Sequence, residues 1–201
     1  MTCGIIPRAP TRKKPLPFEF NPLELARVRL ATFDERHVDG LYTLYSDART
    51  MRYLVRPVLT ERKGAEEMLG RARTGLAEGT SLQLAIERIA DGAFLGSCLL
   101  FNFNQDSRRA EIGYSLVPEH WSQGYLAEAL PALIDHAFGS LGLNRLEADI
   151  DPDNAASKRV LERHGFRYEG LLRERWIVRG TPSDTAMYGL LQREWRAPQL
   201  R

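Results

Sequence analysis

The sequence has little cysteine. Its 201 residues include only Cys3 and Cys98, which are too few and too far apart for a zinc site or a disulfide framework. Cys98 lies in an apolar, strand-like run and is predicted to be a small core residue. Such sparse use of cysteine fits a reducing, cytoplasmic setting. The histidines lack metal-ligand spacing, so no metal is expected, and surface positions are predicted for all four, His37, His120, His136 and His164.

Long apolar runs and a strong charge imbalance are also absent. No apolar stretch approaches the roughly 18 residues that a membrane span needs, so no membrane partner is expected. The formal net charge of +2 is too small to indicate nucleic-acid binding by itself. Apolar residues make up 43% of the chain, which is enough for a sizeable core. The length favours one domain with a tail.

Residues 1–22 differ from the rest of the chain. They hold five of the eleven prolines and four basic residues before the first acidic one, Glu19. Because proline resists helix and removes backbone donors, this segment is predicted to be a flexible basic arm that precedes a domain over residues 23–201. A solvated tail is the simpler interpretation. Contact with RNA or an acidic partner stays open, although four charges give only weak phosphate affinity.

The domain alternates between strand and helix patterns. Asp34 and Thr60 are expected to cap helices, and Asp91-Gly92 indicates a hairpin turn. Three consecutive strands joined by tight turns favour antiparallel pairing, and a later strand–helix–strand unit favours a mixed section. A mixed α/β fold with a single, mostly antiparallel sheet is therefore predicted. The expected strands cover 28–33, 82–86, 94–103, 108–117, 145–150, 166–172 and 185–191, and the expected helices 34–46, 60–77, 124–140 and 154–164.

The stretch 111–129 is the most informative part of the sequence. It reads as a half-buried strand, a short turn with Gly124 at its centre, and the start of a helix. The first amides of a helix have no internal partner, so such a junction suits an anion. An ordinary helix start with a turn glycine is the alternative. The sequence contains neither a Gly-x-Gly-x-x-Gly fingerprint nor a glycine-rich loop followed by Lys-Ser/Thr, which disfavours dinucleotide and P-loop sites.

At this point the sequence resembles the GNAT acetyltransferase superfamily, and more closely its ribosomal-protein N-acetyltransferase branch, the RimJ/RimL type. The resemblance covers roughly residues 25–196 and rests on several motifs in the right order. These are Glu111-Ile112-Gly113-Tyr114, Pro118, Trp121-Ser122-Gln123-Gly124-Tyr125, Glu128-Ala129, Ala137-Phe138, Leu141-Gly142-Leu143-Asn144-Arg145-Leu146-Glu147-Ala148, Pro152, Asn154, Ser157, Val160-Leu161, Gly165-Phe166, Glu169-Gly170, Asp184 and Glu194-Trp195.

The resemblance implies a twisted sheet with a V-shaped splay and about four flanking helices, with the splay between the strand that ends at Val117 and the one that starts at Arg145. Acetyl-CoA would place its pyrophosphate on the turn and its pantetheine in the splay. The larger Leu126 stands where the family usually has Gly or Ala, and it either crowds a phosphate or points into the core. The implied acetyl-CoA contacts are Leu116, Val117, Trp121, Ser122, Gln123, Gly124, Tyr125, Leu126, Ala127, Asn154 and Ser157.

Transfer of an acetyl group to an amine needs a base for the ammonium proton. Glu111 is the candidate base, with a solvent-facing strand residue as the alternative. Glu147 on the neighbouring strand could serve instead, unless Arg145 two residues earlier pairs with it. The resemblance implies that Ser157 meets the CoA sulfur, since Leu161 occupies the position of a frequent tyrosine acid. Asp184 shapes the acceptor pocket or is a turn residue.

The expected activity is acetyl-CoA-dependent N-acetylation, by direct attack through a tetrahedral intermediate. The resemblance favours a ribosomal or other protein N-terminal amine as the acceptor. An amino acid, polyamine or drug is the alternative acceptor, and a CoA-binding module without catalysis is the alternative from another class. Direct nucleic-acid binding is not expected, and the chain could be a monomer or a homodimer.

Overall fold

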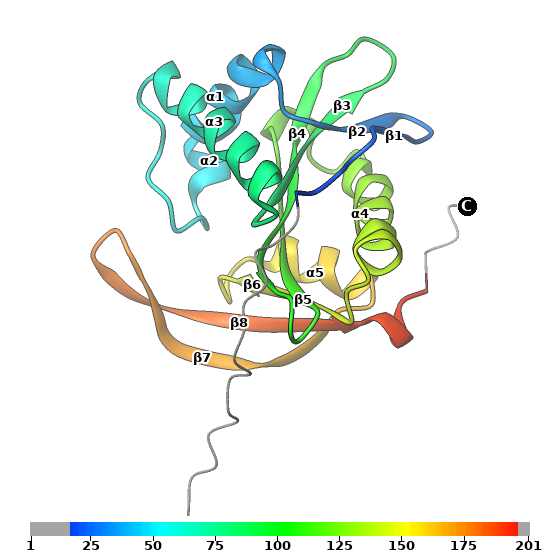
Figure 1. Cartoon of the computed structure of the whole chain (residues 1–201). Coiled ribbons are helices and arrows are strands. Elements are labelled where there is room, and N and C mark those ends of the chain that lie inside the picture. Colours follow the sequence, from blue (N-terminus) through cyan, green and yellow to red (C-terminus); the bar gives the residue numbers. More distant parts are fainter. Residues whose placement is uncertain (1–16, 197–201) are drawn as a thin grey trace, which may run out of the picture.

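Eight strands form one mixed sheet in the computed structural model, which describes residues 17–196 (Figure 1). Their order across the sheet is β1-β2-β3-β4-β5-β6-β8-β7, and every neighbouring pair is antiparallel except β5 and β6. The strands are β1 (Leu23–Glu24), β2 (Val28–Thr32), β3 (Leu82–Arg88), β4 (Phe94–Asn104), β5 (Arg109–Leu116), β6 (Arg145–Ile150), β7 (Arg167–Val178) and β8 (Thr181–Leu191). The predicted mixed, mostly antiparallel sheet is confirmed.

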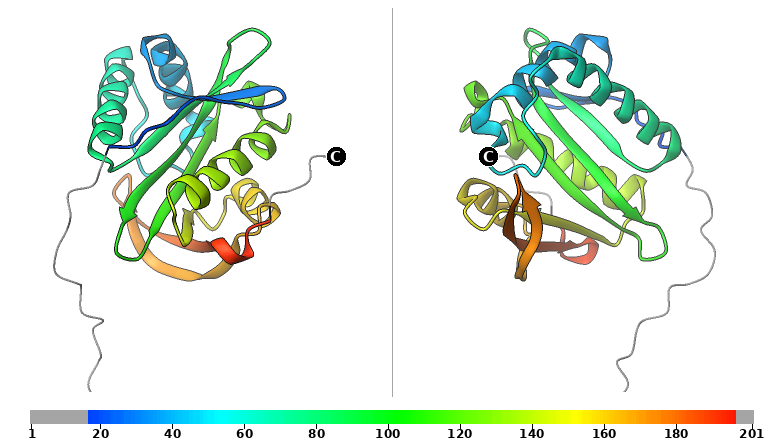
Figure 2. Two further views of the ribbon diagram at one scale, coloured as in Figure 1. Left: turned by 45° about the vertical axis from the view of Figure 1, so that its right-hand side comes forward. Right: turned by 90° about the vertical axis from the view of Figure 1, so that its left-hand side faces the viewer.

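Helices cover both faces of the sheet (Figure 2). One core cluster joins α1 and α3 to the sheet, and the other joins α4 and α5 to it. No helix in residues 17–196 is long and apolar enough to cross a membrane. The α-helices are α1 (Val38–Ser46), α2 (Ala48–Met51), α3 (Arg62–Glu78), α4 (Tyr125–Asp135) and α5 (Ala155–Arg163). Short 3₁₀ or π turns are η1 (Glu35–His37), η2 (Pro118–His120), η3 (His136–Ser140) and η4 (Gln192–Glu194).

The two parallel strands in the centre of the sheet separate after a short contact. Strands β5 and β6 pair only from Arg109↔Arg145 to Glu111↔Glu147. Beyond this point β5 stays paired with β4 as far as Leu116, and β6 stays paired with β8 as far as Ile150. The two halves of the sheet therefore diverge, and the expected V-shaped splay is confirmed.

Several local predictions were wrong in detail. Thr60 does not cap α3: the N-cap is Glu61, whose side chain makes no capping hydrogen bond. The short helix α2 was missed, because four residues carry no readable period. The β7–β8 hairpin is longer than expected and turns at Arg179-Gly180, where both residues have positive φ. Asp184 is therefore a residue inside β8 and not a turn residue.

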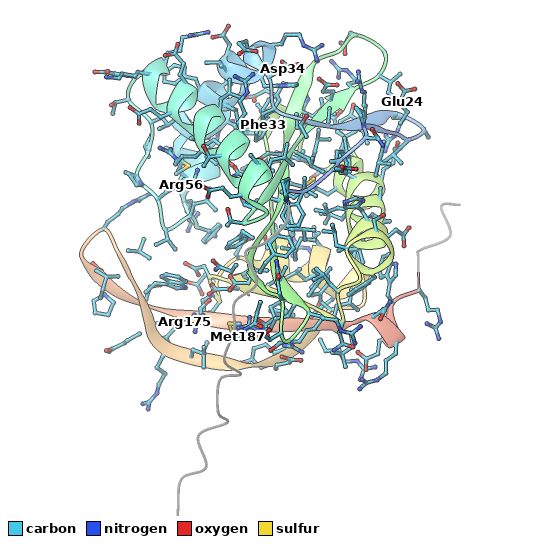
Figure 3. The ribbon with its side chains drawn as sticks, in the orientation of Figure 1. Glu24, Phe33, Asp34, Arg56, Arg175 and Met187 are labelled. Atoms are coloured by element: carbon cyan, nitrogen blue, oxygen red, sulfur yellow. The ribbon has the colours of Figure 1, made fainter. Side chains whose placement is uncertain are left out.

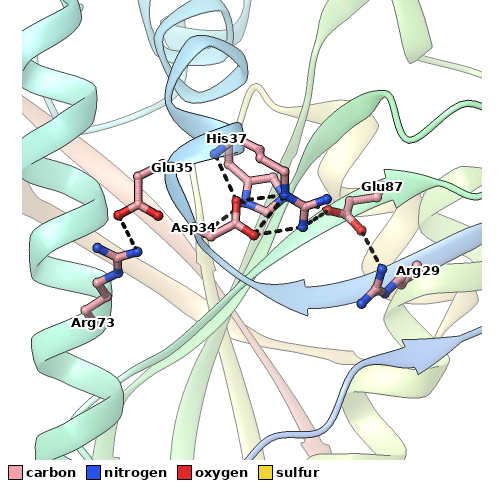
Figure 4. Close-up of polar contacts among 7 residues, drawn as sticks. Arg29, Asp34, Glu35, His37, Arg73 and Glu87 are labelled. Carbon is pink, nitrogen blue, oxygen red and sulfur yellow. Dashed lines mark hydrogen bonds and ion pairs between the residues drawn. The ribbon is translucent and has the colours of Figure 1, made fainter.

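The surface position predicted for His37 and His164 was also wrong, since both are buried. His37 Nδ1 accepts from the Asp34 amide at 2.9 Å, which assigns the ring proton to Nε2. Nε2 then donates to Glu87 Oε1 at 2.7 Å, with Arg29 3.7 Å from the same carboxylate (Figure 4). The ring is thus part of the cap that joins the end of β2 to β3.

The last residues of the expected arm, 17–22, are packed against the domain. The Phe18 amide donates to the Leu76 carbonyl at 2.9 Å, and its ring lies 4.7 Å from that of Phe103. The ring of Phe20 meets His136 edge-on at 5.0 Å. Residues 1–16, which contain the basic residues of the arm, lie outside the described residues.

Candidate active site

The turn between β5 and α4 presents a row of backbone amides. Gly124 is the N-cap of α4 with φ +80°, a conformation that glycine adopts without strain, and Ser122 also has positive φ (+59°). No side chain caps this helix. In the part of the chain that the structure describes, the amides of residues 122–127 donate no hydrogen bond. They form a concentrated set of donors at the positive end of a helix.

Neighbouring side chains hold this turn in shape. Trp121 Nε1 donates to the Leu116 carbonyl at 2.8 Å, and Gln123 Nε2 donates to the Glu119 carbonyl at 2.7 Å. The Val117 amide donates to the Leu95 carbonyl at 2.9 Å. The Leu116 carbonyl and the Val117 amide therefore already have partners. These two residues shape the wall of the splay, and the free donors begin only at residue 122.

The side chains at the start of α4 divide between core and surface. Tyr125 is buried, and Leu126 packs against the main core cluster. Ala127 and the preceding residues 121–124 are exposed. Of the two orientations expected for Leu126, the structure shows the inward one, so its side chain leaves the space in front of the amides open.

A buried carboxylate anchors the turn to the start of β2. Glu128 accepts from the amides of Arg27 and Val28 at 2.6 and 3.2 Å and from Arg27 Nε at 3.0 Å. Burial opposes the charge on Glu128, but these hydrogen bonds prevail and lower its pKa. Arg27 also donates to the Gln123 carbonyl at 3.1 Å. Sequence reasoning missed this support, because Arg27 and Glu128 are far apart in the chain.

Glu111 is the last residue of β5 that pairs with β6, so it lies at the point where the two strands begin to diverge. A bulge in β4 gives Asn102 a φ of +51° and aims its side-chain amide at Glu111 Oε1, 3.1 Å away. Burial raises the pKa of the Glu111 carboxyl, and the charges of Asp149 and Glu147 add to this, while the Asn102 hydrogen bond opposes it. A carboxylate with a raised pKa at the mouth of a cleft is suited to take up a proton.

Glu147, the alternative base, is held by two arginines. Its Oε1 accepts from Arg145 Nε at 2.8 Å, and its Oε2 accepts from Arg109. Arg145 also donates from Nη1 to Glu169 Oε1 at 2.9 Å, which extends this ion-pair network to β7. Since both carboxylate oxygens already pair with guanidinium groups, Glu147 has the structural role that its spacing from Arg145 suggested.

A second acidic centre, which the sequence did not reveal, lies on β6 beyond Glu147. Asp149 accepts from Thr185 Oγ1 at 2.6 Å, from Trp176 Nε1 at 3.0 Å and from Arg175 Nε at 3.1 Å. These partners come from β7 and β8, so Asp149 holds the hairpin against the sheet. Arg175 is labelled in Figure 3. Asp184 Oδ1 accepts from the Glu174 amide at 2.8 Å across the β7 irregularity and thereby fixes the hairpin's shape.

The start of α5 faces β5 across the splay. Asn154 Oδ1 accepts from the Ser157 amide at 3.0 Å and thereby caps α5. Tyr114 on β5 donates its hydroxyl to the Ser157 carbonyl at 3.3 Å. Burial raises the pKa of the Tyr114 hydroxyl, so it stays protonated and acts as a donor. Leu161 is a core residue, and Tyr114 is the hydroxyl that sequence reasoning overlooked.

Residues 27–167 match the family model described as the acetyltransferase (GNAT) domain. The chain belongs to the GNAT acetyltransferase family. It is 33% identical over 169 residues to the uncharacterised N-acetyltransferase p20 of Bacillus licheniformis, covering 84% of this chain and 95% of that protein. It is 37% identical over 82 residues to the ribosomal-protein-serine acetyltransferase of Escherichia coli, covering 41% and 46%.

The fold agrees with this GNAT assignment. The structure of Mycobacterium smegmatis RimJ in complex with CoA-disulfide superimposes with a TM-score of 0.77 at 25% identity, over 87% of each chain. GNAT-fold acetyltransferases use acetyl-CoA, so this chain is an acyltransferase of the N-acetyltransferase type. The expected superfamily, fold and enzyme class are confirmed. The individual site residues stay predictions that the geometry either supports or leaves with a structural role.

Proposed function

We propose that this protein transfers the acetyl group of acetyl-CoA to a protein or peptide N-terminal amine. One observation carries the proposal. The splay between β5 and β6 begins at Glu111, and the amides of residues 122–127 follow the end of β5 at its open side. This arrangement puts a base, space for a thioester and an anion-binding turn along one cleft. The ribosomal-protein-serine acetyltransferase among the relatives supports a protein acceptor.

The residues present fit acetyl-CoA. The amides of residues 122–127 would hold the pyrophosphate, because their hydrogens lack partners in the described chain and the helix dipole favours an anion. Gly124 lets phosphate oxygens approach the backbone closely. The pantetheine would enter the splay toward Asn154 and Ser157, whose helix forms one wall. In this proposal Leu116 and Val117 contribute packing, and Tyr125 and Leu126 contribute their backbone amides only.

The proposed chemistry needs three groups of this chain. Glu111 takes a proton from the acceptor ammonium, directly or through water, so that a neutral amine can attack. The new bond joins the amine nitrogen to the acetyl carbon, and the carbon–sulfur bond breaks as the tetrahedral intermediate collapses. The CoA thiolate leaves and takes up the remaining proton that the nitrogen gives up, directly or through water. Ser157 orients the sulfur, while Tyr114 fixes the first turn of α5 through the Ser157 carbonyl. The raised pKa of Tyr114 favours this positioning role over proton donation.

The structure weakens the alternative of a CoA-binding module without catalysis. Its support in the sequence was Leu126 and the missing tyrosine acid. Leu126 packs inward, so it does not obstruct the turn. Glu111, a partly buried carboxylate where β5 and β6 diverge, suits the proton transfer that a transferase needs and a module that only binds CoA does not.

The proposal is tested by calorimetry with acetyl-CoA, followed by a transfer assay that detects free thiol. The acceptors tested are peptides with a free N-terminal amine, free amino acids and spermidine. Saturable binding and turnover with peptides are expected. Turnover with spermidine but with no peptide would move the function to the small-amine alternative, and binding without turnover of any amine would support the module. The cytoplasmic setting and the oligomeric state stay predictions.

A further inference from the structure

Three exposed arginines lie at or beside the tip of the β7–β8 hairpin. None of the ion pairs in residues 17–196 includes Arg52, Arg56 or Arg179, although most arginines around them are paired with carboxylates. All three side chains are exposed. Positive charge that the protein itself does not neutralise is available to a partner.

These arginines come together because the hairpin meets the helical layer. Arg179, at the tip of the β7–β8 hairpin, donates to the Met51 carbonyl at 3.1 Å. Arg52 is the next residue after Met51, and Arg56 follows four residues after Arg52, in the segment between α2 and α3. Figures 1 and 3 show the hairpin tip reaching the segment between α2 and α3, where Arg56 is labelled. We call Arg52, Arg56 and Arg179 the arginine rim.

The guanidinium groups of the rim are held by neutral contacts. Arg56 stacks over the Tyr45 ring with its Cζ 5.0 Å from the ring centroid, and Arg52 stacks over Tyr53 at 5.1 Å. Such stacking restrains a guanidinium and leaves its edge donors free for hydrogen bonds. The rim is therefore better prepared to bind a carboxylate than freely rotating surface lysines would be.

Exposed apolar side chains lie beside the rim. Of the nine large apolar side chains that are strongly exposed in the described chain, four lie near the hairpin tip or on the segment 52–61: Val55, Val58, Trp176 and Ile177. Trp176 and Ile177, near the hairpin tip, are 37% and 62% exposed, and Val55 between the rim residues is 47% exposed. Tryptophan and arginine together are typical of surfaces that bind peptides and proteins.

The charge changes sign along the hairpin. At its base, the Glu111 carboxylate lies near those of Glu147 and Asp149, which suits an ammonium. Glu111 aligns through Glu147 with Gly189 of β8, and the hairpin turn adjoins Thr181, eight residues from Gly189 along that strand and about 26 Å away at the usual rise. An extended peptide spans about 3.3–3.6 Å per residue. With its amine at Glu111, its residues from about the eighth onward would reach the rim.

Resting on the proposed function, we infer that the arginine rim selects acceptor peptides that carry acidic residues from about the eighth position onward. Glu111 receives the ammonium, and the rim binds the carboxylates.

The inference is tested with three peptides that differ only at positions eight and nine, where they carry Asp-Asp, Asn-Asn or Lys-Lys. Two exposed charge pairs predict that kcat/KM for the Asp-Asp peptide exceeds that for Asn-Asn by about three- to tenfold at low salt. The difference should lie in KM, shrink at high salt, and be larger still against Lys-Lys. The doubly substituted Arg56→Gln/Arg179→Gln protein should lose this ranking while its activity on the Asn-Asn peptide changes little.

The control variant is Arg71→Gln. Arg71 is an exposed arginine on α3 that pairs with Glu67 at 3.8 Å. The variant should keep the full preference for the Asp-Asp peptide. Equal kcat/KM for the three peptides, or a preference that survives the double substitution, would overturn the rim's role and leave the proposed function standing. Binding of acetyl-CoA without turnover of any peptide would defeat the proposed function itself. Efficient turnover of spermidine but of no peptide would overturn both.

Discussion

Replacing Glu111 by glutamine should slow acetyl transfer while the protein stays folded and binds acetyl-CoA normally. Glutamine keeps the size of the side chain and can still accept from Asn102, whose amide lies 3.1 Å from Glu111 Oε1. It cannot accept a proton. Positioned general bases typically contribute on the order of 10²- to 10⁴-fold to a rate. Turnover of a peptide amine at neutral pH should fall by roughly this factor.

The pH dependence makes this prediction specific. Because burial raises the pKa of the Glu111 carboxyl, the base is lost through protonation at a higher pH than an ordinary glutamate would show. The wild-type rate should therefore fall toward acid with a limb that the Glu111→Gln protein lacks. At high pH the amine is already neutral, so the two rates should approach each other.

Stability supplies the control for folding. A carboxyl whose pKa is higher in the folded state binds its proton more tightly there, so its ionised form disfavours the fold. This cost is present above the folded-state pKa and vanishes below the unfolded-state value. The melting temperature of Glu111→Gln at neutral pH should equal or exceed that of the wild type. Normal turnover of a folded Glu111→Gln protein at neutral pH would refute the reasoning and leave water as the base, since Glu147 is paired on both oxygens.

Four further changes follow from the contacts. Ser157→Ala and Tyr114→Phe should each lower kcat by less than Glu111→Gln does, with acetyl-CoA affinity nearly unchanged in calorimetry, and Tyr114→Phe should destabilise the fold by about 1 kcal/mol for one lost hydrogen bond. Glu128→Ala leaves buried backbone amides without an acceptor and should lower stability to urea by about 1–3 kcal/mol. A chain that begins at Leu23 loses the contacts of Phe18 and should melt below one that begins at residue 17, whereas equal melting temperatures would show that this packing is dispensable.

The parts of the fold that follow a simple period could be predicted from the sequence. The strand patterns between Leu82 and Leu116 and the helix after Gly124 are expressed in local residue order, and the structure places them within a few residues of the prediction. The hairpin of β7 and β8 was underestimated. The side chains of β7 are mostly exposed on both faces, so no alternation marks this strand.

The site was predictable where it depends on the backbone of one segment. The turn around Gly124 is such a case, since the glycine and the strand–helix junction are both visible in the sequence. Asn102 and Asp149 were not predictable, because a β-bulge and cross-strand contacts bring their side chains into place. His37 was misjudged for the same reason: its burial depends on Glu87, a residue on another strand.

The central claim is that the amides of residues 122–127 bind acetyl-CoA, and calorimetry on Gly124→Val tests it most directly. A β-branched residue at φ +80° strains the turn and covers the donors. Gly92→Val is the matched control, because Gly92 has a similar φ of +70° with open space around it, away from the turn. The account predicts that Gly124→Val binds acetyl-CoA at least tenfold more weakly, about 1.4 kcal/mol, while Gly92→Val binds like the wild type. Unchanged affinity in a folded Gly124→Val protein would contradict it.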